Sequence, residues 1–568
     1  MNANKITIKG IFNGSRELVI PFYQRAYVWK EENWERFLND LEIVTFTKKP
    51  YFIGSIILKA EQVNTWDSIT DKKIIVDGQQ RLTTLVLFFK ALCLKTNKEN
   101  LFERDFVLEN GEIALKTGKN DCDAFRKVME HTKDEPIKDD DNTTNIIKAF
   151  NFFLKNIDIK KVDRMIIQQN LEFVCIDLDA NEDEQQVFDT INSLGVKLTT
   201  AELLKNYFYS NNDEIQYEKN WAPAFEKDDE TKKYWNQEFE AGNIKKTLID
   251  EFFDSFFKIH INNSHYQISS EDKNLYGRSD YLFSSYKDFI KKYCNGDKNA
   301  VLSNLFSYAE LFRKTFDPSW KSRCIPKEFC LERLNVIIFG LKNTTLIPYV
   351  LFVQKNVSDY NERNDIFAIL EKFIMRRIIT KENTKNYHKM FQSLIANKVL
   401  SKESLLKSFN EVENDVALIP TDADLERCLK ESKLNNLQAK GVIYMIETSL
   451  RDSKDSTALL GFDKYSLEHL MPKNWRKEWK MVSNEKERDA TLQTLGNLAI
   501  ITQSLNASIR DGDWTTKLHG KNKSPGLISC SSGLKTMEDV INKDIWDEDQ
   551  IKNRAKWLYD IAIDLWSI

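Results

Sequence analysis

Residues 467–472 read Leu-Glu-His-Leu-Met-Pro, and residues 495–506 read Leu-Gly-Asn-Leu-Ala-Ile-Ile-Thr-Gln-Ser-Leu-Asn. The first segment places an acidic residue directly before a histidine, and Pro472 then fixes the backbone φ angle and leaves a rigid corner. The second segment carries two asparagines, Asn497 and Asn506. Together the two segments combine an imidazole with several oxygen donors. A site that transfers a proton and binds a hard cation such as Mg²⁺ needs these groups.

Hydrolysis of a phosphodiester requires a base for the attacking water and a divalent cation that neutralises charge on the phosphate and the leaving oxygen. We expect His469 to be this base, and Glu468 and Asn506 to bind Mg²⁺ or Mn²⁺ together with water. Asn497 is expected to brace the loop that carries His469. This inventory is typical of a single-metal nuclease of the HNH type. The alternative is that the Glu-His pair is a surface feature and the asparagines belong to plain turns.

A cationic and aromatic run follows the histidine segment, with Trp475, Arg476, Lys477, Trp479 and Lys480. Such a run is typical of a surface that contacts a phosphate backbone. An amphipathic helix with a solvated face explains the same pattern, so both interpretations stay open.

Aromatic side chains crowd the segment from residue 18 to residue 29, which reads Leu-Val-Ile-Pro-Phe-Tyr-Gln-Arg-Ala-Tyr-Val-Trp. Tyr23, Gln24 and Arg25 stand at its centre. Aromatic rings around one guanidinium indicate either a cation–π packing cluster or the wall of a pocket for a base or a phosphate.

Residues 77–84 read Asp-Gly-Gln-Gln-Arg-Leu-Thr-Thr and follow a predicted strand over 73–76. We expect a buried helix over 85–94. A strand that ends in a glycine turn and opens a helix directs backbone N–H groups toward a bound phosphate. Arg81 would contact that phosphate, and Asp77 would hold Mg²⁺ or orient a water. Alternatively, the Asp-Gly pair is a plain turn and the two threonines are helix N-caps.

Hydrophobic periodicity predicts a helix over 33–46 and strands over 51–59 and 171–178. Long helical patterns with polar breaks fill residues 215–430. This is the pattern of a multidomain α+β protein, and a length of 568 residues suggests about three units. We expect these units over residues 1–212, 213–425 and 426–568.

The composition limits the classes of function. A net charge of −4 means that nucleic-acid binding would rest on local basic patches. The eight cysteines include no Cys-x-x-Cys pair and are expected to be reduced thiols. The first residues lack the apolar core of a signal peptide, and no run approaches the ~18 apolar residues of a membrane span. These features predict a cytoplasmic protein with no membrane partner.

Several parts of the sequence resemble the GmrSD-type modification-dependent restriction enzymes. Members of that family carry an (Asp/Glu)-His-x-x-Pro segment, then Gly-Asn-Leu, then an asparagine and a lysine. Here these positions fall on Glu468, His469, Pro472, Gly496, Asn497, Leu498, Asn506 and Lys517. The N-terminal part of the family resembles residues 20–29 and 77–84, and a further family block resembles residues 188–205.

The resemblance implies a ParB- and sulfiredoxin-like N-terminal domain that binds and hydrolyses a nucleoside triphosphate, with GTP among the candidates, and regulates the nuclease. Asp77 and Arg81 would act in the hydrolysis. The residues expected to bind the nucleotide are Tyr23, Gln24, Arg25, Gly78, Gln79, Gln80 and Thr83. The resemblance further implies a mostly helical middle and a C-terminal ββα-metal nuclease of the HNH type. The substrate would be double-stranded DNA, namely modified phage DNA, and a homodimer is a further expectation.

Two other functions fit the same residues. A nickase that senses a phosphorothioate backbone would use the same architecture. A nucleotide-switched DNA-binding regulator would carry an inert HNH-like segment. Metal-dependent DNA cleavage by the purified protein separates the regulator from both nucleases.

Overall fold

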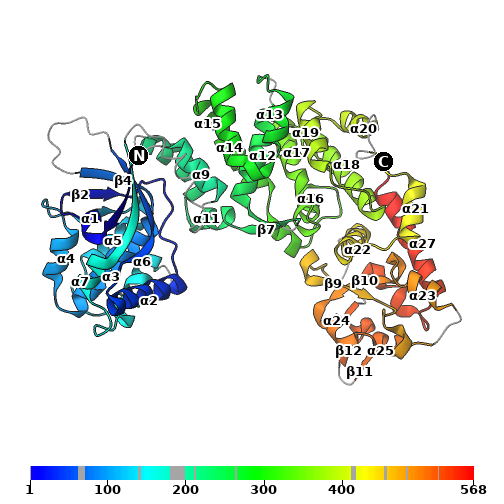
Figure 1. Cartoon of the computed structure of the whole chain (residues 1–568). Coiled ribbons are helices and arrows are strands. Elements are labelled where there is room, and N and C mark those ends of the chain that lie inside the picture. Colours follow the sequence, from blue (N-terminus) through cyan, green and yellow to red (C-terminus); the bar gives the residue numbers. More distant parts are fainter. Residues whose placement is uncertain are drawn as a thin grey trace. The chain divides into compact units, whose positions relative to one another are not determined.

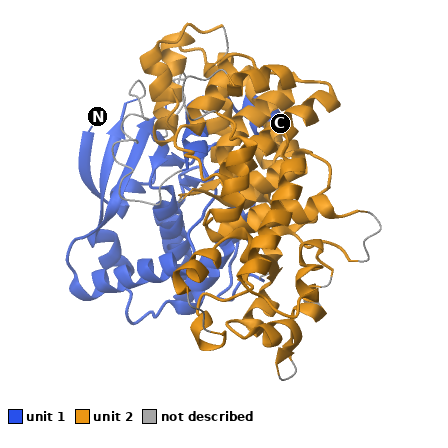
Figure 2. Cartoon of the chain, turned by 90° about the vertical axis from the view of Figure 1, so that its right-hand side faces the viewer, with its two compact units in different colours: residues 1–222 blue, residues 223–568 orange. Residues whose placement is uncertain are grey.

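The computed structural model (Figure 1) describes residues 2–61, 71–138, 143–179, 199–209, 213–242, 244–262, 265–410, 418–452, 457–480, 484–521, 524–531 and 533–568. The chain divides into two compact units, Met1–Ala222 and Pro223–Ile568 (Figure 2). The fold is mixed α+β and multidomain, as predicted. Within the described ranges, no helix combines the length and the apolar character needed to cross a bilayer.

A six-stranded mixed sheet forms the centre of the first unit. Its strands are β1 (Asn2–Thr7), β2 (Arg16–Val19), β3 (Tyr51–Ala60), β4 (Asp71–Asp77), β5 (Leu115–Lys116) and β6 (Leu171–Leu178). The strand order is β1-β6-β3-β4-β2-β5. The pairs β1–β6 and β3–β4 are antiparallel, whereas β3–β6, β2–β4 and β2–β5 are parallel. The strands predicted over 51–59 and 171–178 are therefore confirmed as β3 and β6.

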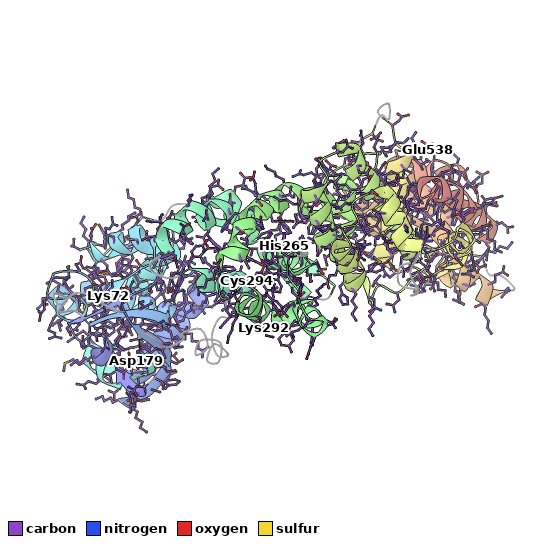
Figure 3. The ribbon with its side chains drawn as sticks, turned by 90° about the horizontal axis from the view of Figure 1, so that it is seen from above. Lys72, Asp179, His265, Lys292, Cys294 and Glu538 are labelled. Atoms are coloured by element: carbon purple, nitrogen blue, oxygen red, sulfur yellow. The ribbon has the colours of Figure 1, made fainter. Side chains whose placement is uncertain are left out.

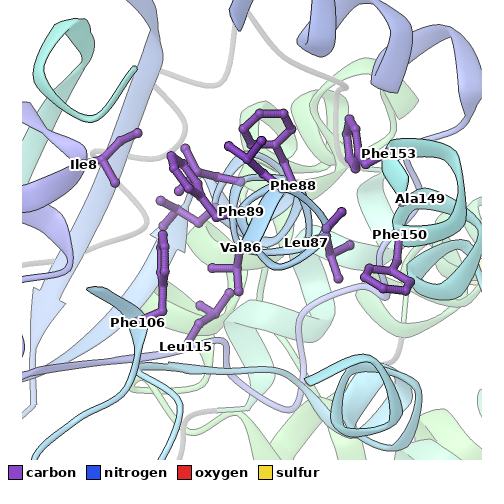
Figure 4. Packing of buried hydrophobic residues seen from close by; sticks show 14 of the residues in the cluster. Ile8, Val86, Leu87, Phe88, Phe89, Phe106, Leu115, Ala149, Phe150 and Phe153 are labelled. Carbon is purple, nitrogen blue, oxygen red and sulfur yellow. The ribbon is translucent and has the colours of Figure 1, made fainter. Parts of the chain in front are cut away.

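Helix α3 (Gln79–Lys95) is the core of this unit, because every residue from Gln79 to Leu94 except Arg81 is buried. Phe88 packs edge-on against Phe153 of α6 (Asn145–Asn156), as Figure 4 shows. The other helices of the unit are α1 (Ile8–Ile11), α2 (Glu31–Thr47), α4 (Glu99–Phe106), α5 (Lys119–Met129), α7 (Arg164–Asn170), α9 (Thr200–Phe208) and α10 (Glu214–Gln216). Helix α2 confirms the helix predicted over 33–46.

Helix α3 begins earlier than the sequence pattern predicts, at Gln79 rather than at Leu85. Gly78 is its N-cap and has a φ of 100°, which glycine adopts without strain. Thr83 and Thr84 therefore lie inside the helix, and their interpretation as N-caps is wrong. The Thr84 hydroxyl instead donates a hydrogen bond to the Gln80 carbonyl at 2.7 Å.

The second unit is mostly helical, as the patterns over 215–430 predict. Its first part contains β7 (Glu238–Ala241) and β8 (Ile244–Thr247), and the π- and 3₁₀-helical turns η3 (Tyr217–Glu226, which starts before the unit), η4 (Ser279–Tyr281), η5 (Pro318–Ser322), η6 (Val336–Gly340) and η7 (Thr344–Leu346). Its α-helices are α11 (Asp229–Trp235), α12 (Leu248–Ile261), α13 (Ser270–Tyr276), α14 (Leu282–Tyr293), α15 (Asn299–Thr315), α16 (Leu331–Asn335), α17 (Ile347–Asn356), α18 (Tyr360–Ile379), α19 (Tyr387–Ala396), α20 (Lys402–Asn410) and α21 (Asp422–Glu431). These helices belong to the same compact unit as the C-terminal part of the chain, and the domain boundary expected between residues 425 and 426 stays a prediction.

The C-terminal part contains two antiparallel strands, β9 (Tyr465–His469) and β10 (Leu498–Thr502), followed directly by helix α24 (Gln503–Ile509). Around them lie α22 (Asn436–Leu450), η8 (Phe462–Lys464), η9 (Trp475–Lys477), α23 (Glu485–Thr491), η10 (Leu495–Asn497), α25 (Trp514–His519), β11 (Gly520–Lys521), β12 (Ser524–Pro525), α26 (Leu527–Ser531), η11 (Lys535–Met537), η12 (Val540–Asn542) and α27 (Glu548–Leu565). The pairing of β9 with β10 brings the two motif segments side by side.

The described cysteines are free thiols, in agreement with the prediction that they are reduced. The seven cysteines with described side chains are free thiols, and Cys324 among them is exposed. Cys294, labelled in Figure 3, is buried, and burial raises the pKa of its thiol. Such thiols are packing groups rather than reactive ones.

Candidate functional site

Strand β9 carries both Glu468 and His469 at its C-terminal end. The strand register places His469 opposite Leu498 and Glu468 opposite Ala499. Helix α24 brings Asn506 to the same strand, because its amide Nδ2 donates to Ser466 Oγ at 3.1 Å and to the Leu467 carbonyl at 3.2 Å. The structure therefore places Glu468 and His469 consecutively on β9 and binds the Asn506 amide to the residues just before them on the same strand.

The carboxylate of Glu468 forms an ion pair with Lys517, whose side chain is fully buried. The Lys517 ammonium also donates to the His469 carbonyl at 2.7 Å. Burial raises the pKa of the Glu468 carboxyl; Lys517 opposes this shift and the negative charge of Asp511 adds to it. Burial lowers the pKa of Lys517, while Glu468 and Asp511 act in the opposite direction. Lys517 thus holds the last two residues of β9 together.

The imidazole of His469 is only partly exposed and makes no hydrogen bond to any group in the described part of the chain. Burial, assisted by the positive charges of Lys473 and Lys517, lowers the pKa of His469 to about 4. The imidazole is therefore neutral at neutral pH and has a ring nitrogen available to accept a proton.

The side chain of Asn497 is fully buried and uses all four of its hydrogen-bonding positions. Its Oδ1 accepts from the Met471 N–H at 2.8 Å and from the Trp546 indole N–H at 3.0 Å. Its Nδ2 donates to the carbonyls of Met471 at 2.8 Å and Leu492 at 2.9 Å. The Leu470 N–H donates to the Asn497 carbonyl at 2.9 Å. Asn497 thereby fixes the chain immediately after His469.

The run that follows the histidine segment does not form a long amphipathic helix; it contains the short turn η9. Trp475 is fully buried and donates its indole N–H to Asp489 at 2.8 Å. Arg476 pairs with Glu485 and Asp489. The amphipathic-helix interpretation is therefore wrong, and Arg476 is an exposed residue that pairs with two carboxylates at the surface. Lys477 and Lys480 of the run are exposed and can contact phosphate, as can Lys473 just before it.

In the first unit, three glutamines connect the segment around residue 25 to the turn between β4 and α3. Gln24 Nε2 donates to the Ile75 carbonyl at 2.6 Å. Gln79 Nε2 donates to the Arg25 carbonyl at 3.1 Å, and Gln80 Oε1 accepts from the Val28 N–H at 2.9 Å. Most of these amide groups therefore bind main chain. The exception is Gln79 Oε1, which is buried and has no hydrogen-bond partner within the described ranges.

Arg81 and Asp77 lie at the N-terminal end of α3. The Arg81 guanidinium donates to the Ser55 carbonyl at 2.6 Å and lies 3.5 Å from the Asp77 carboxylate. Gly54 makes room for it, because a Cβ on Gly54 would lie 2.2 Å from Arg81 Nη1. The two side chains keep 20% and 25% of their surface exposed, so both can still contact a ligand.

The other predicted nucleotide-binding residues are less accessible. Thr83 lies inside α3 with 3% of its surface exposed, and Tyr23 is 5% exposed and packs edge-on against Phe22. Of the family block over 188–205, residues 188–198 lie outside the described residues. The described remainder opens α9, where Thr199 and Glu202 form a reciprocal N-cap.

The sequence patterns did not predict three residues that complete the C-terminal site. Asp511 acts electrostatically on Glu468 and Lys517. Trp546 contacts Asn497, and Arg554 contacts the turn that contains it. Both lie in the last helical stretch of the chain, where no motif spacing marks them. Within the described residues, no group of three or more His, Cys, Asp or Glu side chains could hold a metal ion.

Comparison with known proteins identifies two regions of the chain. The family model "GmrSD restriction endonuclease, N-terminal domain" matches residues 8–209. The model "GmrSD restriction endonucleases, C-terminal domain" matches residues 419–561. The two matches together span more than half of the chain and contain both sites described above. None of the curated proteins compared with the chain matches it.

Proposed function

The chain belongs to the GmrSD restriction endonuclease family, and from this membership we propose that it is a metal-dependent endonuclease that cleaves modified phage DNA under the control of a nucleoside triphosphate. The observation that supports the nuclease most strongly is the placement of Glu468 and His469 on β9, with the Asn506 amide bound to the residues just before them. The order of β9, β10 and α24 also agrees with the proposed ββα-metal fold of the HNH type.

In this proposal His469 takes a proton from the attacking water. Its depressed pKa keeps the imidazole in the neutral form that can do so. Asn497 fixes the main chain of Leu470 and Met471, and Lys517 binds the His469 carbonyl, so the backbone that carries the imidazole is held on both sides. A base that is held in one position reacts faster, because its approach to the water needs no further ordering.

The donor set at this site fits Mg²⁺ or Mn²⁺. Glu468 offers a carboxylate and Asn506 an amide Oδ1, since Asn506 uses its Nδ2 to bind β9. Two oxygen donors suffice for Mg²⁺, which usually keeps several waters. When bound, the cation would neutralise charge on the scissile phosphate and the leaving oxygen. Lys517 pairs with one oxygen of Glu468 and so orients the carboxylate.

The first unit has features that fit a nucleoside triphosphate. The first turn of α3 has no side-chain cap, so its N–H groups are available to an anion. Arg81 would bind phosphate, Asp77 would hold a cation or orient water, and the unpaired Gln79 Oε1 would accept from the ligand. Gln24 and Gln80 would act indirectly, because they hold the Tyr23–Val28 segment against this site.

The direct experiment is cleavage by the purified full-length chain. Plasmid and phage DNA with ordinary cytosines, glucosylated cytosines or a phosphorothioate backbone are incubated with Mg²⁺ or Mn²⁺, with and without ATP or GTP. Metal-dependent cleavage that prefers a base-modified DNA supports the proposal. Nicking restricted to the phosphorothioate DNA points to the nickase, and absence of cleavage with retained DNA binding points to a regulator.

A further inference from the structure

The turn that contains Asn497 is held from outside the motif by helix α27. Arg554 of this helix is buried, and its Nη1 donates to the carbonyls of Gly496 at 2.8 Å and Leu498 at 2.7 Å. Its Nη2 donates to the Thr536 carbonyl at 3.3 Å. Within the described ranges no carboxylate lies within ion-pair distance of the guanidinium, whose hydrogen bonds all go to main-chain carbonyls; Asp539 and Glu447 act on it at longer range. The Arg554 guanidinium thereby fixes the main chain on both sides of Asn497.

The turn also lies directly against the helix. A Cβ on Gly496 would lie 2.1 Å from the Ile551 carbonyl oxygen and 3.0 Å from the Ala555 Cβ. No larger residue fits between the turn and α27 without displacing main chain. The position of Asn497 is therefore set by α27 as well as by its own hydrogen bonds.

Trp546, just before α27, contacts the Asn497 side chain itself. Its indole is buried and donates to Asn497 Oδ1 at 3.0 Å, the same atom that accepts from the Met471 N–H. The ring stacks on Trp514 with a centroid distance of 5.3 Å and an interplanar angle of 24°. Trp514 is in turn fixed by a 2.8 Å hydrogen bond to the Lys543 carbonyl. The indole N–H thus has a defined direction and keeps the Asn497 amide from rotating.

We propose that Trp546 and Arg554 are positioning residues of the nuclease site, which hold the Gly-Asn-Leu turn and, through Asn497, the loop after His469. This inference rests on the proposed function. Neither residue touches the imidazole or the oxygen donors, so both act through Asn497 and Met471. The proposal predicts that weakening either one slows the chemical step while DNA and metal binding stay unchanged.

The informative variants are Trp546→Phe, which removes the indole N–H, and Arg554→Lys, which keeps the charge but loses the planar fork. The matched control is Trp566→Phe. Trp566 is equally buried in the same unit, and its indole N–H points to Glu371 at 3.4 Å, away from the turn. Circular dichroism first establishes that each full-length variant is folded.

Two readouts are measured on each variant. The first is kcat, KM and Mn²⁺ affinity for DNA cleavage; we expect Trp546→Phe and Arg554→Lys to lower kcat about 10- to 100-fold, the range typical of partners that orient a ligand, with KM and metal affinity unchanged. The second is amide hydrogen exchange of the peptide that contains Leu470 and Met471, without DNA or metal. We expect faster exchange in both variants, and in an Asn497→Ala background we expect Trp546→Phe to add nothing further.

Unchanged kcat and exchange in both variants would overturn the proposal. An equal loss in Trp566→Phe would also overturn it, since the effect would then be general destabilisation. If the wild-type chain cleaves no DNA but the exchange pattern appears as expected, the proposed function fails and the positioning of this loop by Trp546 and Arg554 stands.

Discussion

The side chain of Asn497 forms hydrogen bonds of 2.8 Å with both the backbone N–H and the backbone carbonyl of Met471. Met471 lies two residues after His469, so the Asn497 amide holds the chain just beyond the end of the strand that carries the imidazole. The sequence places these residues in separate segments, and the β9–β10 pairing brings them together. The main chain immediately after His469 is therefore fixed by a buried side chain from the second segment.

Asn497→Ala is expected to damage both stability and cleavage. The change leaves buried main-chain groups of Met471 and Leu492 without partners, which should lower the free energy of unfolding of the second unit by about 3 kcal/mol. Chemical denaturation and plasmid cleavage measure the two effects. Asn542→Ala is the matched control, because Asn542 is exposed and its amide donates to the Glu538 carbonyl at 2.7 Å rather than to a site residue. Equal behaviour of the two variants would contradict the role given to Asn497.

Asn506→Ala is expected to weaken Mn²⁺ binding at least about tenfold while leaving the fold intact, because it removes an oxygen donor from a partly exposed position. Calorimetric titration of the full chain with Mn²⁺ measures the affinity. Glu468→Gln is the companion variant; Glu468→Ala is unsuitable, since it would leave the buried Lys517 without its partner. Unchanged Mn²⁺ affinity in both Asn506→Ala and Glu468→Gln would place the metal elsewhere.

Arg81→Ala and Asp77→Ala are each expected to abolish nucleoside triphosphate hydrolysis, since these two side chains reach solvent at the start of α3. Arg126→Ala removes an exposed positive charge from the same unit and serves as the control. Phosphate release with ATP and with GTP is the measurement. Nucleotide hydrolysis at the wild-type rate in both site variants would show that the Asp-Gly-Gln-Gln-Arg segment has a structural role and no catalytic one.

Asp121 predicts a pH dependence of the first unit. Its carboxylate accepts from the Tyr27 N–H at 2.8 Å, and burial raises its pKa to about 6 from 3.8. The folded state therefore binds a proton more tightly than the unfolded state, so this group's contribution to stability is full at low pH and is lost as pH rises through about 6. The loss amounts to about 2 kcal/mol between about pH 4.5 and about pH 7.5.

The matching variant is Asp121→Asn, which keeps an oxygen that accepts from Tyr27 but cannot ionise. Relative to the wild type, it should raise the thermal midpoint of the first unit at neutral pH and change it little near pH 4. The opposite order, with the larger gain at acid pH, would show that Asp121 is stabilised in its charged form.

Much of the fold follows from local sequence signals. The periodic patterns of α2, β3 and β6 lie within one or two residues of the elements that form. The sequence pattern does not predict the start of α3, because the polar residues Gln79 and Gln80 are typical of a loop. In the structure both are buried in the helix and bind the main chain of residues 25–28. These contacts span more than fifty residues of sequence, and no local pattern reports them.

Short motifs mark Glu468, His469 and Asn497 in the sequence, and the bracing contacts expected of Asn497 are present in the structure, whereas the chemical roles of Glu468 and His469 stay predictions. Trp546 and Arg554 were not, because a buried tryptophan and a buried arginine in a helical stretch have many packing explanations. The run after His469 suggests a phosphate-binding surface that includes Arg476. In the structure, Arg476 instead pairs with two carboxylates that follow later in the chain. In each case a tertiary contact decides the role of the side chain.

The central claim is that His469 is the base of a DNA-cleaving site. It is tested by plasmid cleavage with Mg²⁺ or Mn²⁺ on base-modified DNA, comparing the wild type with His469→Ala and with His519→Ala, which changes an exposed histidine of the same region. We predict cleavage by the wild type and by His519→Ala, and none by a folded His469→Ala protein that still hydrolyses nucleotide. Cleavage by His469→Ala at the wild-type rate would contradict the account.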